Sequence, residues 1–172
     1  NTTLPSFKLI NAIDSTIFNS DSLSSSKGKV IMFICNHCPF VIHNHQQISE
    51  ISSKYQDQIE FIAISSNDVN SYPEDSPEKM LKLAKSNGWN FPYLFDESQQ
   101  VAKSFKAACT PEFYLFNKQN SLIYRGRVDD SSPTNNNPST GKDLRQAIDN
   151  FIANKSISKT QYPSMGCNIK WK

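Results

Sequence analysis

The feature that most constrains the fold is an uninterrupted apolar run, Val30–Ile34, which leads directly into Cys-Asn-His-Cys-Pro at residues 35–39. The run is rich in β-branched and aromatic residues, which predicts a strand buried on both faces. Beyond the proline, apolar residues recur at helical spacing, and these are Val41, Ile48, Ile51 and Tyr55. Cys35 and Cys38 therefore stand where a central strand becomes a helix.

The start of a helix favours the reactive form of a cysteine, because unpaired N–H groups and the positive end of the helix dipole stabilise a thiolate. Two residues separate Cys35 from Cys38, so their sulfurs can come within bonding distance. A ring this small hardly restrains the unfolded chain, so the disulfide is suited to be a redox switch rather than a staple. His37 lies inside the ring, and a partly protonated imidazole would lower the pKa of Cys35 further.

Two other interpretations of the cysteine pair are a pair of ordinary buried thiols and half of a zinc site. Zinc usually requires a second pair of ligands at a distance. His43 and His45 follow the motif, but residues two apart on a helix point to different faces. The favoured prediction is therefore redox chemistry that needs no metal and no other cofactor.

The composition excludes several classes of function. A length of 172 residues predicts one domain, residues 1–172, with an extended tail over residues 155–172. The net charge of +2, with no basic run interleaved with aromatic residues, gives no indication of nucleic-acid binding. No stretch approaches the roughly 18 apolar residues of a membrane helix.

Cysteine usage bears on the compartment. Four cysteines are too few for a disulfide scaffold in a chain of this size, so we expect catalytic thiols in a reducing compartment, the cytoplasm. The chain begins at Asn1 without methionine, as it would after removal of an upstream segment, and what remains shows no signal peptide.

The rest of the chain alternates strand and helix patterns. We expect a β-hairpin within residues 4–26, a strand over 59–64, a helix from 77 to 86, a short helix over 99–105, a hairpin from strands 112–116 and 122–128, and a helix over 141–154. The apolar strand before Cys35, the helix after Pro39 and strand 59–64 form a βαβ unit, which requires a parallel pair of strands with a right-handed crossover. The aromatic segment 89–95 is interpreted as core rather than a substrate groove, and we expect Met165, Ile169 and Trp171 to pack the tail against the domain.

Four motifs resemble the peroxiredoxin-like, thioredoxin-family proteins of the redoxin (AhpC/TSA-like) group. They lie at residues 35–41, 108–113, 124–130 and 166–171. The resemblance implies an α/β thioredoxin-like fold of the redoxin variant, with an N-terminal β-hairpin and a central mixed sheet flanked by helices.

The resemblance also implies roles for individual residues. Cys35 matches the thioredoxin nucleophile and Cys38 the resolving cysteine, while Thr110-Pro111 matches the cis-proline segment that faces the cysteines and holds substrate backbone; a proline just before a strand is a natural place for a cis bond. Cys109 would then lie near the dithiol, either with a redox role or as a small buried residue. Cys167 is either a C-terminal resolving cysteine, folded back towards Cys109 or the pair, or a thiol buried by the tail.

Three functions follow from these motifs. The first is a thiol-disulfide oxidoreductase acting on a disulfide-containing protein or small molecule and regenerated by a thiol electron donor. The second is an antioxidant thiol peroxidase in which peroxide oxidises Cys38, although Cys35 occupies the position where peroxidases carry threonine. Peroxidases of this group also carry an arginine beside the reactive cysteine, and neither Arg125 nor Arg127 matches its position clearly. The favoured interpretation of these two arginines is a row of surface charges paired with Asp129 or Asp130. The third, a metal-binding chaperone, would need a distant histidine.

Overall fold

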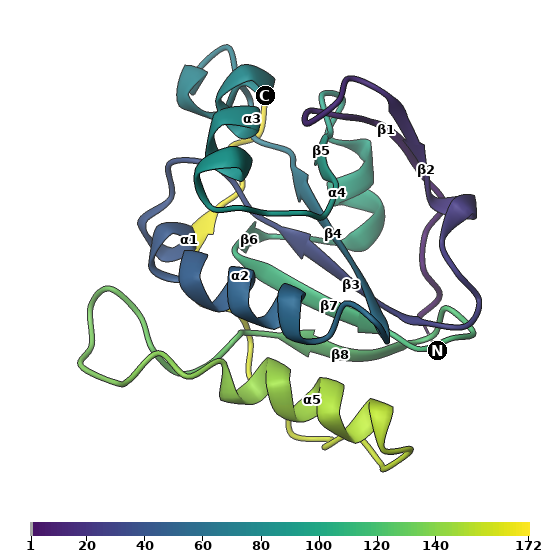
Figure 1. Ribbon diagram of the computed structural model, residues 1–172. Helices are drawn as coiled ribbons and strands as arrows, with labels where there is room; N and C mark the ends of the chain where they lie inside the picture. The colour runs from purple at the N-terminus through teal and green to yellow at the C-terminus, as the bar shows by residue number, and fades with distance from the viewer. Residues whose placement is uncertain (1) are drawn as a thin grey trace.

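The computed structural model describes residues 2–172, and its main feature is a seven-stranded sheet in the order β2-β1-β5-β4-β3-β7-β8 (Figure 1). The strands of this sheet are β1 (Lys8–Asn11), β2 (Ile17–Asn19), β3 (Gly28–Phe33), β4 (Ile59–Ser65), β5 (Tyr93–Phe95), β7 (Glu112–Phe116) and β8 (Leu122–Gly126). A separate two-stranded sheet joins β6 (Cys109–Thr110) to β9 (Cys167–Asn168). The helices are α1 (Pro39–His43), α2 (His45–Lys54), α3 (Pro77–Ser86), α4 (Gln100–Phe105) and α5 (Lys142–Ile152), and short 3-10 turns cover Ser20–Ser22 and Pro73–Asp75.

Strand β3 lies in the interior of the sheet, between β4 and β7, as its apolar sequence predicts. It pairs in parallel with β4 and antiparallel with β7. Its side chains alternate between two cores: Val30 and Met32 pack under α1, α2, α3 and α5, whereas Ile31 and Phe33 pack against α4 on the other face. Figure 1 shows α1 and α2 on one side of β3 and α4 on the other. The mixed sheet flanked by helices and the parallel βαβ unit are therefore confirmed.

The segment after the cysteine motif differs from the prediction of one continuous helix. It forms two helices, α1 and α2, which meet at Asn44. Asn44 has φ −95° and ψ 0° and ends α1 through its backbone N–H, which donates to the Val41 carbonyl at 2.9 Å, while its side chain makes no capping hydrogen bond. All four apolar residues predicted to face inward here, Val41, Ile48, Ile51 and Tyr55, are buried.

The N-terminal hairpin and the later hairpin are confirmed as the antiparallel pairs β1–β2 and β7–β8. The aromatic segment belongs to the core, as predicted, with Trp89, Phe91 and Tyr93 all buried. Helix α5 is shorter than the expected 141–154, and Ile152, in its last turn, is 36% exposed.

The tail, residues 155–172, contains one short strand, β9, and lies against the domain. Ile169 is 3% exposed, whereas Trp171 is 43% exposed, so the first anchors the tail and the second covers only part of its surface. The Asp68 N–H donates to the Lys170 carbonyl at 2.8 Å, and the Ile169 N–H donates to the Ala108 carbonyl at 3.1 Å. In Figure 1 the yellow arrow of β9 lies beside α1 and β6. No helix within residues 2–172 is long and apolar enough to cross a membrane.

Candidate active site

The two cysteines of the motif lie beyond the carboxyl end of β3, and Thr110 contacts both of them. Cys38 caps the N-terminus of α1, and each sulfur belongs to a side chain only 1% exposed. Cys35 Sγ lies 3.6 Å from Thr110 Oγ1, and Cys38 Sγ lies 3.5 Å from the Thr110 carbonyl oxygen. The Thr110–Pro111 peptide bond is cis. The expectation that this segment faces the cysteine pair is therefore confirmed.

The charge of the dithiol resides on Cys38. A hydrogen bond from the Cys35 thiol contributes most to lowering the pKa of Cys38, to about 4, and the Cys167 thiol and the Val41 N–H at the start of α1 add to this effect. The pKa of Cys35 is raised well above its ordinary value, because its proton is held between the two sulfurs, its side chain is buried, and the Asp75 carboxylate lies nearby. These directions differ from the sequence-based expectation of a Cys35 thiolate, which stays a prediction. Helix α1 begins only at Pro39, so its N–H groups reach Cys38.

His37 does not act on Cys35 in the way its position in the motif predicts. Its Nδ1 lies 2.7 Å from Asp75 Oδ2, and its ring stacks on Tyr72 with centroids 5.5 Å apart. The charge that shifts the pKa of Cys35 is the carboxylate of Asp75, and it shifts that pKa upward. The largest contributions that raise the pKa of Cys35 thus come from Cys38, from burial and from Asp75.

Asp75 is the site residue that the sequence did not reveal. It is fully buried, and its Oδ1 accepts the N–H groups of Asn36 at 2.8 Å and His37 at 3.3 Å, both within the cysteine motif. Its Oδ2 accepts from Asn67 Nδ2 at 2.9 Å. Asp75 stands in a polar loop with other acidic residues, where the sequence carries no signal that one carboxylate points inward.

A second buried contact fixes the same loop. The Tyr93 hydroxyl donates to Asn36 Oδ1 at 2.9 Å, and Asn36 Nδ2 donates to the Glu74 carbonyl at 2.9 Å. Complete burial raises the pKa of Tyr93 well above its ordinary value, so the phenol keeps the proton that it donates. The loop between the two cysteines is thus held from β5 and from the Pro73–Asp75 turn.

Cys167 and Cys109 lie on the two strands of the small sheet, and only one of them faces the dithiol. Thr110 pairs with Cys167, and Cys109 pairs with Asn168. Because neighbouring residues of a strand point to opposite faces and paired residues share a face, Cys167 lies on the same side as Thr110. Cys167 packs against the buried cluster that contains Cys35 and Cys38, and it contributes to lowering the pKa of Cys38. The tail therefore folds Cys167 back onto the cysteine pair.

Cys109 occupies the opposite face of β6. Its sulfur lies 4.0 Å from the Ser164 carbonyl oxygen, and burial, followed by the nearby Glu112 carboxylate, raises its pKa to about 11. The edge of Thr110, expected from the resemblance to hold substrate backbone, is paired here with the tail strand β9.

The arginines are paired elsewhere than predicted. Arg125 bridges to Glu112 at 3.1 Å and Arg127 to Asp143 at 2.6 Å. Asp129 instead accepts the backbone N–H groups of Ser131 and Gly141, so the predicted ladder with Asp129 or Asp130 is wrong.

A set of metal-binding atoms is present at the motif. One ligand atom each of Cys35, His37 and Asp75 lies within 4.8 Å of the other two. Asp75 thus takes the place that a distant histidine was expected to fill. An ion at this position would have to displace the hydrogen bonds that Asp75 makes to the loop.

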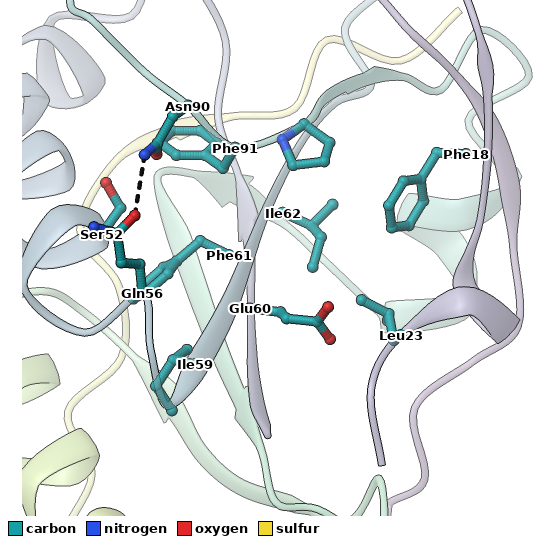
Figure 2. Close-up of a pocket in the computed structure, with 11 residues that line it drawn as sticks. Phe18, Leu23, Ser52, Gln56, Ile59, Glu60, Phe61, Ile62, Asn90 and Phe91 are labelled. Atoms are coloured by element: carbon teal, nitrogen blue, oxygen red, sulfur yellow. Dashed lines mark hydrogen bonds between the residues drawn. The ribbon is translucent and has the colours of Figure 1, made fainter. Parts of the chain in front are cut away.

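The hollow shown in Figure 2 lies far from the cysteines. It has a volume of about 180 Å³ and is lined by residues that include Phe18, Ile59, Glu60, Ile62 and Phe91. These residues place it at the amino end of β4, whereas Cys35 follows the carboxyl end of the parallel neighbour β3. By contrast, the hollow lined by Phe40, Pro111 and Met165, near the dithiol, has a volume of only about 10 Å³. Such a space holds one water molecule at most.

Comparison with known proteins adds family and fold. An uncharacterised conserved protein from Geobacillus kaustophilus is 46% identical with a TM-score of 0.97, over 99% of this chain and 91% of that one. A hypothetical protein from Sinorhizobium meliloti is 38% identical with a TM-score of 0.96, over 99% and 93% of the respective chains. A secreted disulfide oxidoreductase from Mycobacterium tuberculosis shares the fold at 17% identity, with a TM-score of 0.62 over 81% and 92%. No curated protein matches. The Redoxin family model matches residues 1–144, and the chain belongs to the redoxin family.

Proposed function

We propose that the protein is a thiol-disulfide oxidoreductase whose redox centre is the Cys35–Cys38 pair. The observation that carries this proposal is the position of both sulfurs against the cis Thr110–Pro111 segment: Cys35 Sγ lies 3.6 Å from Thr110 Oγ1, and Cys38 Sγ, at the start of α1, lies 3.5 Å from the Thr110 carbonyl oxygen. Sulfurs this close, on a loop held by Asp75 and Tyr93, are suited to close a disulfide with little rearrangement.

The reaction runs through a mixed disulfide. The Cys38 thiolate attacks one sulfur of a substrate disulfide, forms a bond to it and expels the other sulfur as a thiolate. That leaving group takes up the proton that Cys35 gives up. Cys35 then attacks Cys38 Sγ, closes the Cys35–Cys38 disulfide and releases the second substrate thiolate. The substrate gains two electrons and the pair loses two, so an external thiol donor is needed to restore the dithiol.

Reduction of insulin, or of glutathione disulfide, by the prereduced protein tests this function. We expect Cys35→Ser and Cys38→Ser each to lower the rate of turnover by at least about 100-fold. Cys109→Ser is the matched control, because its sulfur faces away from the pair, and it should retain turnover within about twofold. Full turnover in either Cys35→Ser or Cys38→Ser would refute the proposal.

The thiolate at Cys38 favours thiol peroxidase activity as a second candidate. Attack of Cys38 on a peroxide would give Cys38 sulfenic acid and an alcohol or water, and the Cys35 thiol would then condense with it to form the disulfide and water. Rapid peroxide consumption with a sulfenic acid trapped on Cys38 in the Cys35→Ser variant would favour this activity. Consumption no faster than that by free cysteine would exclude it.

Substrate class and compartment belong to the same proposal. We expect disulfide-containing proteins or small disulfides as substrates, a thiol electron donor, and no nucleic-acid partner given the net charge of +2. We also expect action in a reducing compartment, the cytoplasm, because four cysteines are too few for a disulfide scaffold in a chain of this size. Trapping of the resident redox state in intact cells tests this: a wholly oxidised pair would point to an oxidising compartment.

A further inference from the structure

We infer that Cys167 is a third redox cysteine, which exchanges with Cys38 and carries the disulfide between the buried pair and an external thiol partner. This inference rests on the proposed function, because it concerns how the Cys35–Cys38 disulfide is reduced. It assigns a chemical role to the tail, which the matched Redoxin region, residues 1–144, does not include.

The geometry of the small sheet aims Cys167 at the pair. Cys167 stands opposite Thr110, and the carbonyl of Thr110 is the group that Cys38 Sγ contacts at 3.5 Å. The tail approaches this strand very closely: a Cβ added to Gly166 would lie 1.9 Å from the Thr110 carbonyl oxygen. Because Gly166 has no side chain, the two strands can approach this closely, and the following Cys167 packs against the buried cluster that contains Cys35 and Cys38.

The difference in exposure gives the third cysteine its task. Cys35 and Cys38 are each only 1% exposed, so a substrate disulfide or a partner thiol reaches either sulfur only when the chain around them moves, whereas Cys167 needs no such movement. Cys167 is only half-buried, and its neighbour Asn168 is exposed. Among the sulfurs that contact Cys38, it is therefore the one that a partner can attack. Cys109 is also half-buried but faces the other side of β6.

The exchange conserves electrons within the protein. In the oxidised protein the thiolate of Cys167 attacks Cys38 Sγ, the Cys38–Cys167 bond forms, and the Cys35–Cys38 bond breaks. Cys35 leaves as a thiolate and takes up the proton that Cys167 has lost. A thiolate of an external dithiol then attacks Cys167 Sγ, and its second thiol resolves the mixed disulfide. The partner loses two electrons, and Cys38 and Cys167 are reduced.

The charges at the site favour this order of events. In the reduced protein, burial and then the hydrogen bond to Cys38 raise the pKa of Cys167 to about 11, so Cys167 remains a thiol. When Cys38 enters a disulfide it has no charge, and its share of that effect disappears. Cys167 thus becomes easier to ionise when the pair is oxidised, which is the state that requires attack.

Two hydrogen bonds donated by backbone N–H groups shortly after Cys167 hold the tail in place. The Ile169 N–H donates to the Ala108 carbonyl at 3.1 Å, and the Lys170 N–H donates to Asn67 Oδ1 at 2.9 Å. Asn67 also donates to Asp75, the carboxylate under the cysteine loop, at 2.9 Å. The buried side chain of Asn67 therefore hydrogen-bonds both to the tail and to the carboxylate that holds the cysteine loop.

Disulfide mapping of the full chain tests the inference. Cys35→Ser is oxidised with glutathione disulfide and its cysteine linkages are determined by mass spectrometry without reduction. We expect a Cys38–Cys167 disulfide, unchanged in Cys35→Ser/Cys109→Ser and absent in Cys35→Ser/Cys167→Ser. Recovery of Cys38 only as a glutathione adduct, with Cys167 free, would overturn the inference.

A rate measurement tests the inference in a protein that retains Cys35. In Cys167→Ser, reduction of the preformed Cys35–Cys38 disulfide by a thioredoxin-type dithiol protein should be at least about tenfold slower than in the wild type, with Cys109→Ser at the wild-type rate. Equal rates in Cys167→Ser and the wild type would overturn the inference while the proposed function stands. A wild-type protein that never forms the Cys35–Cys38 disulfide would instead refute the proposed function.

Discussion

Asp75 Oδ2 lies 2.7 Å from His37 Nδ1, and the same carboxylate accepts two backbone N–H groups of the cysteine loop through its other oxygen. A residue from the segment after β4 thereby fixes the loop that follows β3. The carboxylate also places a negative charge near Cys35, which adds to the effects of Cys38 and of burial in raising the pKa of that thiol. The buried carboxylate thus supports the backbone of the loop and contributes to the electrostatics of the cysteine pair.

Replacing this carboxylate should destabilise the protein. In Asp75→Ala the N–H groups of Asn36 and His37 lose their buried acceptor, so we expect a loss of about 3 kcal/mol in the free energy of unfolding. Urea denaturation followed by circular dichroism measures it. Glu74→Ala, at the exposed neighbouring position, is the control and should change stability by less than about 0.5 kcal/mol. A loss no larger than that of the control would contradict a structural role for Asp75.

The sequence predicted the strand, the cysteine pair and the facing Thr110-Pro111 segment, because each leaves a local pattern. An apolar run marks β3, two-residue spacing marks the redox pair, and a proline before an apolar strand marks the start of β7. Asp75 leaves no such mark, since its burial depends on how a polar loop packs after the sheet has formed. The direction of the Cys35 and Cys38 pKa shifts was equally hidden, because it depends first on the interaction between the two side chains in the folded protein.

The thiolate should be a property of Cys38. Because the pKa of Cys38 is lowered to about 4, the reduced protein should show thiolate ultraviolet absorbance at neutral pH, lost as the pH falls through about 4. Cys35→Ser should keep that absorbance, since a serine hydroxyl still donates to Cys38, and Cys38→Ser should lose it. Absorbance that survives in Cys38→Ser and disappears in Cys35→Ser would return the thiolate to Cys35.

The other two thiols should titrate far from neutrality. The pKa values of Cys109 and Cys167 are both raised to about 11, mainly by burial, so their ionised fractions are small at neutral pH and grow as the pH rises. We expect alkylation of each by iodoacetamide to accelerate about tenfold per pH unit between neutrality and pH 9. Site-resolved mass spectrometry measures both rates. A rate at either cysteine that is flat over this range would contradict the shift at that cysteine.

The position of the tail depends on contacts that the sequence of residues 155–172 does not predict. The sequence of this segment lacks periodicity, and only its apolar residues indicated that it packs. Its register on β6 is set by Gly166, by the Ala108 carbonyl and by Asn67, which are distant from one another in sequence. The sequence was therefore compatible with Cys167 either folded back towards the other cysteines or merely buried by the tail. Its pairing with Thr110 favours the first of these interpretations.

Removing the Asn67 side chain should loosen the tail. Asn67→Ala deletes the acceptor for the Lys170 N–H and the donor to Asp75, so we expect a loss of about 2 kcal/mol in the free energy of unfolding. Hydrogen exchange at the Lys170 amide should accelerate at least about tenfold. Asn70→Ala, exposed in the same loop, should leave that exchange rate unchanged. Equal protection of Lys170 in both variants would show that Asn67 does not hold the tail.

Gly166→Ala should separate the tail strand from β6. The added Cβ would lie 1.9 Å from the Thr110 carbonyl oxygen and 2.6 Å from its carbon, and both are backbone atoms that cannot swing away. We therefore expect β9 to shift or detach, at a cost of about 2 kcal/mol in the free energy of unfolding, with faster proteolysis after residue 155. Lys155→Ala, on the exposed part of the tail, is the control.

Because the shift would also carry Cys167 away from Cys38, the Cys38–Cys167 disulfide should fall in yield in Cys35→Ser/Gly166→Ala relative to Cys35→Ser. An unchanged yield together with wild-type stability would mean that this close approach of the two strands does not position Cys167.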